Sequence, residues 1–177
     1  MIEDFRLEDV WALPTRGAAD DFRRLVHLIA SGDPTRSSPR PVRLLWAVRW
    51  KVGKFLGWDN HDARSGVPML RDRLPADLRA GPSGPEFAAL PFTSLYLLDD
   101  EWAAETANRT MRGVLHLGWV PDGTVFRGQL AVYVKPNGLL GTGYMAAIRP
   151  FRRLIVYPQM LRQIGRAWRA GTPARRA

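Results

Sequence analysis

Hydrophobic and polar residues alternate with a period of two through much of the second half of the chain. The alternating runs are FTSLYLL (92–98), EWAAETA (101–107), GVLHLGWV (113–120) and TVFRGQLAVYVK (124–135). Turn-forming residues separate the runs, most clearly Pro121, Asp122 and Gly123. Short alternating runs joined by turns predict an antiparallel meander with one covered face and one wet face.

The last two runs indicate which side chains share a face. Leu117 and Trp119 alternate with His116, which places His116 on the wet side. No catalytic partner for His116 is visible in the sequence, although a distant carboxylate could supply one. The apolar face of the last run carries Phe126, Leu130, Val132 and Val134. A glycosylation-type triplet at 108–110 lies between the second and third runs, so we expect it at the tip of a hairpin.

The N-terminal third predicts a short strand and then helices. DVWALP (9–14) is typical of a strand that Pro14 ends. GAADDFRRLVHLIASG (17–32) predicts a helix, with Asp20 and Asp21 near its positive end.

A turn-rich linker follows, and residues 42–56 then predict an amphipathic helix. Trp46 and Trp50 lie off its apolar stripe, beside basic residues, and we expect them to pack on a neighbouring element or to cover an internal cavity. The loop that follows carries three potential ligands for hard metal ions, Asp59, His61 and Asp62. Turn chemistry explains these residues equally well, so we expect no metal site and no cofactor.

The C-terminal part predicts a long helix over LLGTGYMAAIRPFRRLIVYPQMLRQIGRAW (139–168). Its apolar stripe contains Phe151, Leu154, Ile155 and Pro158, and continues, displaced around the axis, in Leu161, Ile164 and Trp168. A kink near Pro158 accounts for the displacement. GTGYMA (141–146) imitates a dinucleotide-binding fingerprint. No acidic residue follows to hold a ribose and no strand completes a βαβ unit, so we reject that interpretation.

The net charge of +9 is unevenly distributed, because no acidic residue follows Asp122. Basic blocks of this kind can contact nucleic acid or anionic membranes, whereas the predominance of arginine over lysine favours a compositional bias. The row Arg162, Arg166 and Arg169 should give only weak contact that is lost at physiological salt.

Other features of composition narrow the class of protein. The absence of cysteine excludes disulfides and thiolate zinc sites. The acidic N-terminus lacks a signal-peptide pattern, and no run reaches the roughly 18 apolar residues of a membrane span. We therefore expect a cytoplasmic protein without a transmembrane segment, whose oligomeric state the sequence leaves open.

Three segments carry a resemblance to a known family: ETANRTMRGVLHLGWV, VYVKPNGLLG with Tyr144, and IRPFRRLIV. They resemble an uncharacterised bacterial domain family, also found appended to epimerase-like NAD-binding domains, which is similar to the START-related helix-grip (SRPBCC) superfamily. The match is best over about residues 92–165. Relatives often have histidine after the Pro-Phe pair, where this chain has Arg152, so no role for that histidine is carried over.

The resemblance implies an α+β helix-grip fold, in which an antiparallel sheet wraps a long C-terminal helix. One or two additional helices would lie in the N-terminal third. Residues 1–170 would form a single domain, and residues 171–177 a flexible basic tail.

Helix-grip domains commonly hold an apolar ligand, so the first predicted function is a binding module for an apolar or amphipathic small molecule between sheet and helix. The expected lining residues are Trp102, Thr106, Leu117, Trp119, Leu130, Val132 and Tyr144. A second possibility is a cyclase- or hydrolase-type enzyme, with acid–base candidates Glu105, Arg109, His116 and Tyr144. A third is a surface binder of anionic membrane or nucleic acid through the basic helices.

Overall fold

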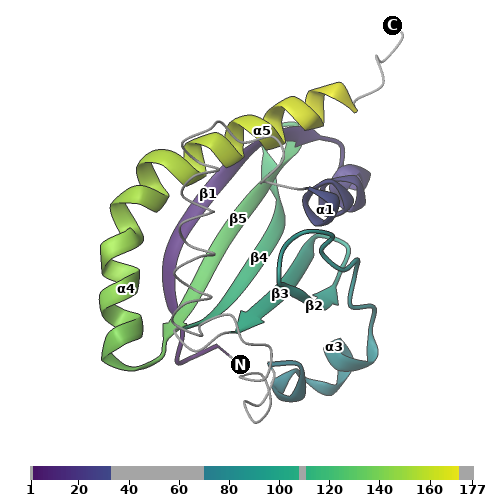
Figure 1. Ribbon diagram of the computed structural model, residues 1–177. Coiled ribbons are helices and arrows are strands. Elements are labelled where there is room, and N and C mark those ends of the chain that lie inside the picture. The colour runs from purple at the N-terminus through teal and green to yellow at the C-terminus, as the bar shows by residue number, and fades with distance from the viewer. Residues whose placement is uncertain (1, 33–69, 108–110, 172–177) are drawn as a thin grey trace, which may run out of the picture.

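The computed structural model describes residues 2–32, 70–107 and 111–171. At its centre is one antiparallel sheet with the strand order β1-β5-β4-β3-β2 (Figure 1). The strands are β1 (Arg6–Gly17), β2 (Thr93–Leu97), β3 (Glu101–Ala107), β4 (Met111–Asp122) and β5 (Val125–Pro136). The helical elements are η1 (Ala19–Asp21), α1 (Phe22–Ser31), η3 (Leu70–Arg73), α3 (Ala76–Ala80), α4 (Gly138–Phe151), the π-helical turn η4 (Arg152–Val156) and α5 (Tyr157–Ala170). This confirms the α+β class, with a long C-terminal helix on an antiparallel sheet and a shorter N-terminal helix.

The meander from β2 to β5 follows the alternation of the sequence, as predicted. Leu117 pairs with Leu130 and Trp119 pairs with Gly128 across β4 and β5. Asp122 pairs with Val125, so two residues close the hairpin between these strands. The first of them, Gly123, has a φ of +69°, which a type II′ turn requires at that position and which glycine adopts without strain.

The first strand is longer than predicted. The expectation that Pro14 ends it is wrong, because β1 continues to Gly17. β1 is the edge strand beside β5, and its register against β5 shifts between Ala12 and Arg16. Proline is tolerated at such an irregular edge, since no further strand needs its missing N–H group.

Helices α1 and α5 cover one side of the sheet, which we call the helix face (Figure 1). Its buried core contains Leu13, Phe22, Leu25, Val26, Ala30, Leu97, Trp102, Ala104, Leu117, Trp119, Leu130 and Trp168. The indole N–H groups of three core tryptophans have acceptors. Trp119 Nε1 donates to the Ala18 carbonyl at 3.0 Å, Trp168 Nε1 donates to the Arg16 carbonyl at 3.0 Å, and Trp102 Nε1 donates to Ser94 Oγ at 3.2 Å.

The opposite side of the sheet, which we call the outer face, is only partly covered. A second cluster packs there, formed by Phe5, Leu70, Leu74, Leu95, Tyr96, Ala103 and Val114. Beyond this cluster, Leu7 is 55% exposed and Val10 is 47% exposed. His116 also lies on the outer face, as predicted, because it pairs across the sheet with Ala103 and Ala131 and alternates with the core residues Leu117 and Leu115.

The C-terminal helical tract bends between α4 and α5 (Figure 1). At the bend, the Tyr157 N–H donates to the Arg152 carbonyl five residues earlier, which is the hydrogen bond of a π-helix. Pro158 follows, and it has no N–H and clashes with the carbonyl four residues back. The wider π turn accommodates this clash, so the bend lies beside Pro158 as expected. The tract is helical through Pro150 and through the rejected fingerprint at 141–146.

Several expectations concern residues outside the described part of the chain. They are the helix 42–56 with Trp46 and Trp50, the possible ligands Asp59, His61 and Asp62, the triplet 108–110 and the tail from residue 172 onward. Within the described ranges, no three potential His, Asp or Glu ligands come together to hold a metal ion. No described helix is long and apolar enough to cross a membrane.

The packing of α1 on the sheet can be tested at Gly128, where an added Cβ would lie 2.6 Å from Leu25 Cδ2 and 2.7 Å from Thr15 Oγ1. We expect Gly128→Ala to lower the free energy of unfolding by about 1–3 kcal/mol, because the crowded site must shift. Gly143 in α4 is the control. An added Cβ there meets nothing within 4 Å, so Gly143→Ala should raise stability by up to about 1 kcal/mol. Urea denaturation measures both, and effects of equal sign would contradict this packing.

Candidate functional site

A partly buried cluster of charges joins β1 to the C-terminal helical tract. The register of β1 against β5 shifts between Leu7 and Asp9, so Glu8 is an extra residue in the strand. A bulge of this kind breaks the regular alternation of side chains and re-aims them. As a result, the two consecutive carboxylates of Glu8 and Asp9 both bind the same guanidinium, that of Arg152.

The π-helical turn supplies the matching pair of arginines. Arg152 Nη2 donates to Glu8 Oε2 at 3.1 Å and to Asp9 Oδ2 at 3.0 Å. Arg153 Nε donates to the other Asp9 oxygen, Oδ1, at 3.0 Å. The extra residue in a π turn shifts the phase of a helix, and π turns are frequent at functional sites. Here the shift lets two consecutive arginines face β1.

Asp9 is the most deeply buried charge of the cluster. Its side chain is 3% exposed, and that of Arg152 is 14% exposed. Removing a carboxylate from water costs several kcal/mol unless partners and hydrogen bonds replace the solvent. Both Asp9 oxygens have a guanidinium partner, so the charge is compensated. The residue therefore fixes how the helical tract sits on β1.

Two aromatic rings border the charges. The rings of Trp11 and Tyr157 lie with their centroids 5.0 Å apart, and the Arg152 guanidinium carbon lies 6.0 Å from the Tyr157 ring centroid. Burial raises the pKa of the Tyr157 hydroxyl. The positive charge of Arg152 opposes this rise, and the Asp9 carboxylate adds to it. Tyr157 is therefore neutral at physiological pH and acts as a hydrogen-bonding group.

Two buried donors beside this ring have no acceptor. Trp11 Nε1 and Arg152 Nε are inaccessible to solvent and make no hydrogen bond within the part of the chain that the structure describes. Of the four described tryptophans, Trp11 alone has an unpaired indole N–H. Buried donors without a partner are rare, because each costs about 1–3 kcal/mol.

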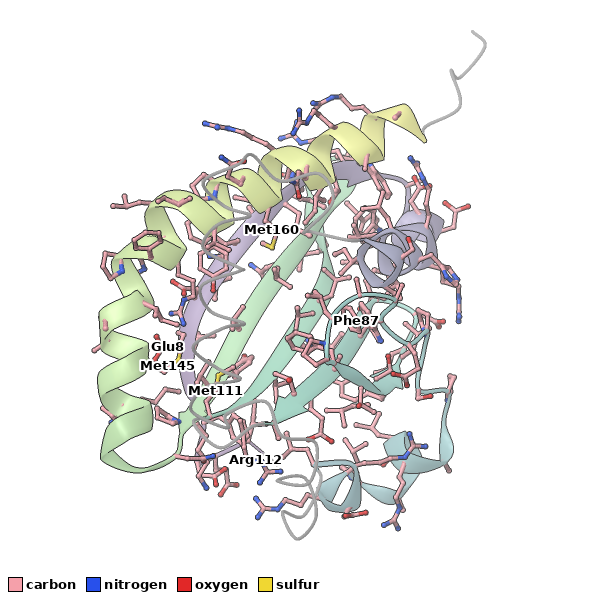
Figure 2. The ribbon with its side chains drawn as sticks, viewed as in Figure 1. Glu8, Phe87, Met111, Arg112, Met145 and Met160 are labelled. Atoms are coloured by element: carbon pink, nitrogen blue, oxygen red, sulfur yellow. The ribbon has the colours of Figure 1, made fainter. Side chains whose placement is uncertain are left out.

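The cluster borders two rows of cross-strand neighbours on the helix face. The first row runs Trp11, Leu130, Leu117, Trp102, and the second runs Asp9, Val132, Leu115, Ala104. In the first row Leu130, Leu117 and Trp102 are fully buried, whereas Val132 and Leu115 in the second row are only half-buried. Figure 2 shows Glu8 on β1, with Met145 on α4 and Met160 on α5 along the helical tract. Met145 is buried, and Met160 packs on the core.

The structure places six of the predicted lining side chains on the helix face: Trp102, Thr106, Leu117, Trp119, Leu130 and Val132. Four of these are core residues, and Trp102 is stacked against Phe87 with the ring centroids 5.0 Å apart. Thr106 and Val132 are half-buried. The backbone of Tyr144 belongs to α4, and its side chain lies outside the described part of the structure. Leu130 and Val132 are the predicted residues that adjoin the charge cluster, opposite Trp11 and Asp9.

The described acid–base candidates of the enzyme hypothesis, His116 and Glu105, lie on the outer face and not on the helix face. His116 Nε2 lies 3.3 Å from Glu101 Oε2 on the outer face, and the Tyr96 hydroxyl donates to the same oxygen at 3.4 Å. Burial, and then the Glu101 charge, raise the pKa of Tyr96 to about 12. Glu105 is buried elsewhere on that face, where its Oε2 accepts the Leu70 N–H. Glu101 is thus the distant carboxylate that the sequence left open. Arg109 lies outside the described residues.

The sequence interpretation missed the charge cluster. Asp9 stands in DVWALP and the arginines stand in the long helix, two segments whose structure was predicted from their apolar pattern, and Glu8 directly precedes the first of them. The available signal was the pair of adjacent acids, Glu8 and Asp9, and the pair of adjacent arginines, Arg152 and Arg153. More than 140 residues separate the two pairs, so no local spacing connects them.

Comparison with known proteins places the chain in a family. Residues 1–159 match the model of the family described as "Protein of unknown function (DUF2867)", and the chain belongs to that family. No curated protein and no solved structure matches the chain significantly.

The contribution of the cluster to stability can be tested at its centre. Asp9→Asn keeps the side-chain shape but removes the charge that faces Arg152 and Arg153, and we expect it to cost about 3–5 kcal/mol. Asp4→Asn is the control, because Asp4 forms an exposed pair with Lys135 and should contribute little to stability. Urea denaturation at neutral pH compares the two. An Asp9→Asn cost no greater than that of Asp4→Asn would refute this role.

Proposed function

We propose that this member of the DUF2867 family is a binding module for an amphipathic small molecule, held between the sheet and the C-terminal helix. The observation that carries the proposal is the unpaired, buried indole N–H of Trp11 beside a compensated ion cluster. A ligand oxygen that accepts a hydrogen bond from Trp11 Nε1, and a second one from Arg152 Nε, would satisfy both donors.

The apolar part of the ligand would lie against the half-buried positions Val132 and Leu115, next to the charge cluster in the second row. Ligand sites typically combine apolar walls with a small number of fixed polar groups. Because the cluster is internally neutralised, its remaining free groups are donors. They favour a head group with an acceptor oxygen, such as a carboxylate or an ester, over an ammonium.

Thr106, Leu130, Val132 and Tyr144 remain in the proposed site from the set expected on sequence grounds. Trp102, Leu117 and Trp119 would support it from the packed end of the same face. The resemblance to START-related helix-grip domains forms part of this proposal, since those domains commonly hold an apolar ligand at the corresponding place.

The enzyme alternative is supported by one observation, the pairing of His116 with Glu101. A carboxylate that orients an imidazole is a recurrent feature of general bases. That pair is half-exposed on the outer face, however, on the side of the sheet opposite Trp11. It therefore cannot act on a molecule bound at the charge cluster, and binding without chemistry is the function that we propose.

The head-group preference gives the first test. Dodecanoate, methyl dodecanoate and dodecylammonium share one tail, and their affinities can be compared by calorimetry and by the shift in melting temperature of the full chain. We expect the two ligands with acceptor oxygens to bind and dodecylammonium to bind more weakly. If none of the three raises the melting temperature, the proposal fails.

Matched variants locate the site. Trp11→Phe keeps the aromatic contact with Tyr157 but removes the donor, so it should weaken dodecanoate binding roughly two- to tenfold. Trp168→Phe is the control, because its indole N–H already bonds the Arg16 carbonyl, and only stability should change. Val132→Trp should block binding, whereas Val120→Trp, in the neighbouring strand on the outer face, should leave it intact. If both Trp11→Phe and Val132→Trp bind dodecanoate with unchanged affinity, the ligand does not use this site, and Trp11 Nε1 and Arg152 Nε bind only water.

A further inference from the structure

At the bend of the C-terminal tract, charged side chains contact the sheet and apolar side chains are exposed. This is the reverse of the usual arrangement in an amphipathic helix. Arg152 and Arg153 both bind Asp9 on the sheet side of the bend, with side chains that are 14% and 46% exposed. Phe151 and Leu154 belong to neither core cluster and are 43% and 76% exposed. Phe151 and Leu154 belong to the apolar stripe of the sequence, but the structure does not pack them on the sheet. The arginines of the π turn neutralise Glu8 and Asp9 there instead.

The fold does not require apolar side chains at these two outward positions. Polar residues at 151 and 154 would leave the ion cluster and the core unchanged, since neither side chain belongs to a core cluster. Of the described large hydrophobic side chains, Leu154 is the most exposed. Exposed apolar side chains that are grouped together commonly mark an interaction surface.

The charge of the same helical tract indicates what that surface contacts. No acidic residue occurs anywhere after Asp122, so α4, η4 and α5 contain none. Arg162, Arg166 and Arg169 are exposed along α5, at four- and three-residue spacing. Exposed apolar side chains followed along the same helical tract by a row of exposed arginines are typical of segments that lie in the interface of an anionic membrane.

We infer that an outer helix patch, formed by Phe151, Leu154, Arg162, Arg166 and Arg169, docks this protein on an anionic lipid surface. The arginines attract the negative surface, and Phe151 and Leu154 insert among the lipids at the boundary between head groups and acyl chains. Nucleic acid fits the patch less well, because the aliphatic side chain of Leu154 cannot stack on bases as an aromatic ring does. This inference is independent of ligand binding at Trp11.

The experiment is co-sedimentation of the full chain with vesicles of phosphatidylcholine alone and of an equimolar mixture with phosphatidylserine. The arginine row alone should lose contact at physiological salt, as expected from the sequence. Insertion of Phe151 and Leu154 adds an apolar contribution, so we expect binding to the mixture that persists in part at physiological salt. The double variant Phe151→Gln/Leu154→Gln should bind more than about tenfold more weakly there. Each of the substitutions Arg162→Gln, Arg166→Gln and Arg169→Gln should weaken binding roughly fivefold and reduce its salt dependence.

The matched control is Leu7→Gln/Val10→Gln, which removes an exposed apolar pair, 55% and 47% exposed, from the outer face of the sheet. It should bind vesicles like the unaltered chain. Because the chain contains no cysteine, Leu154→Cys and Val10→Cys can each carry one environment-sensitive fluorophore. Its emission should shift to the blue on mixed vesicles at position 154 but not at position 10. This measurement reports insertion at the labelled position directly, so it does not depend on a variant that binds more weakly.

Three results would overturn the inference. The first is equal vesicle binding by the unaltered chain and Phe151→Gln/Leu154→Gln. The second is tighter binding to duplex RNA or DNA than to mixed vesicles. The third is self-association in sedimentation equilibrium that Phe151→Gln/Leu154→Gln abolishes, which would assign the patch to a second copy of the chain.

Discussion

The contact between the Asp9 carboxylate and the guanidinium groups of Arg152 and Arg153 constrains the rest of this structure. A carboxylate that is 3% exposed must have charged partners, and here both of them come from one turn of helix. To bring the partners together, the strand accepts a bulge at Glu8 and the helix accepts a π turn. The same π turn accommodates Pro158 and determines which side chains at the bend face away from the sheet.

The helix face of the sheet consequently has two different ends. At one end, the Trp119 indole of β4 bonds the Ala18 carbonyl just before η1, and the Trp168 indole of α5 bonds the Arg16 carbonyl of β1. The second bond ties α5 to the sheet. At the other end, Trp11 lies in the row of Leu130, Leu117 and Trp102, and its N–H has no acceptor among the described residues. The transition occurs between neighbouring cross-strand rows, where full burial at Leu130 gives way to half burial at Val132. Ligand sites typically combine such a packed apolar wall with a few polar groups that are available for hydrogen bonds.

The parts of this fold that depend on local pattern could be predicted from the sequence. Alternation through Leu115, Leu117 and Trp119, with a tight turn at Gly123, sufficed for β4, β5 and their shared apolar face. The prediction at Pro14 was wrong, because only an edge strand tolerates proline in its interior. Whether a strand lies at the edge depends on the strand order of the sheet, which the sequence of one segment does not reveal. The apolar stripe of the sequence contains Phe151 and Leu154, but a helical period alone does not show that these two residues are exposed. Arg152 and Arg153 contact the sheet because they pair with Asp9, which lies 143 and 144 positions before them in the chain. No local pattern shows a pairing over that distance.

The candidate site was predictable only in part for the same reason. Leu130 and Val132 were found from the face that they share. Asp9, Trp11 and Arg152 were not, since their significance lies in the contact between the two ends of the chain. Stability alone does not account for that contact, because well-packed apolar side chains commonly replace a buried ion cluster at no loss of stability, and often with a gain. An apolar replacement would lose a fixed helix phase, the Arg152 donor beside Tyr157, and an outward position for Phe151 and Leu154. One cluster of four charges thus determines both surfaces to which we assign a function, one between helix and sheet and the other on the outside of the bend.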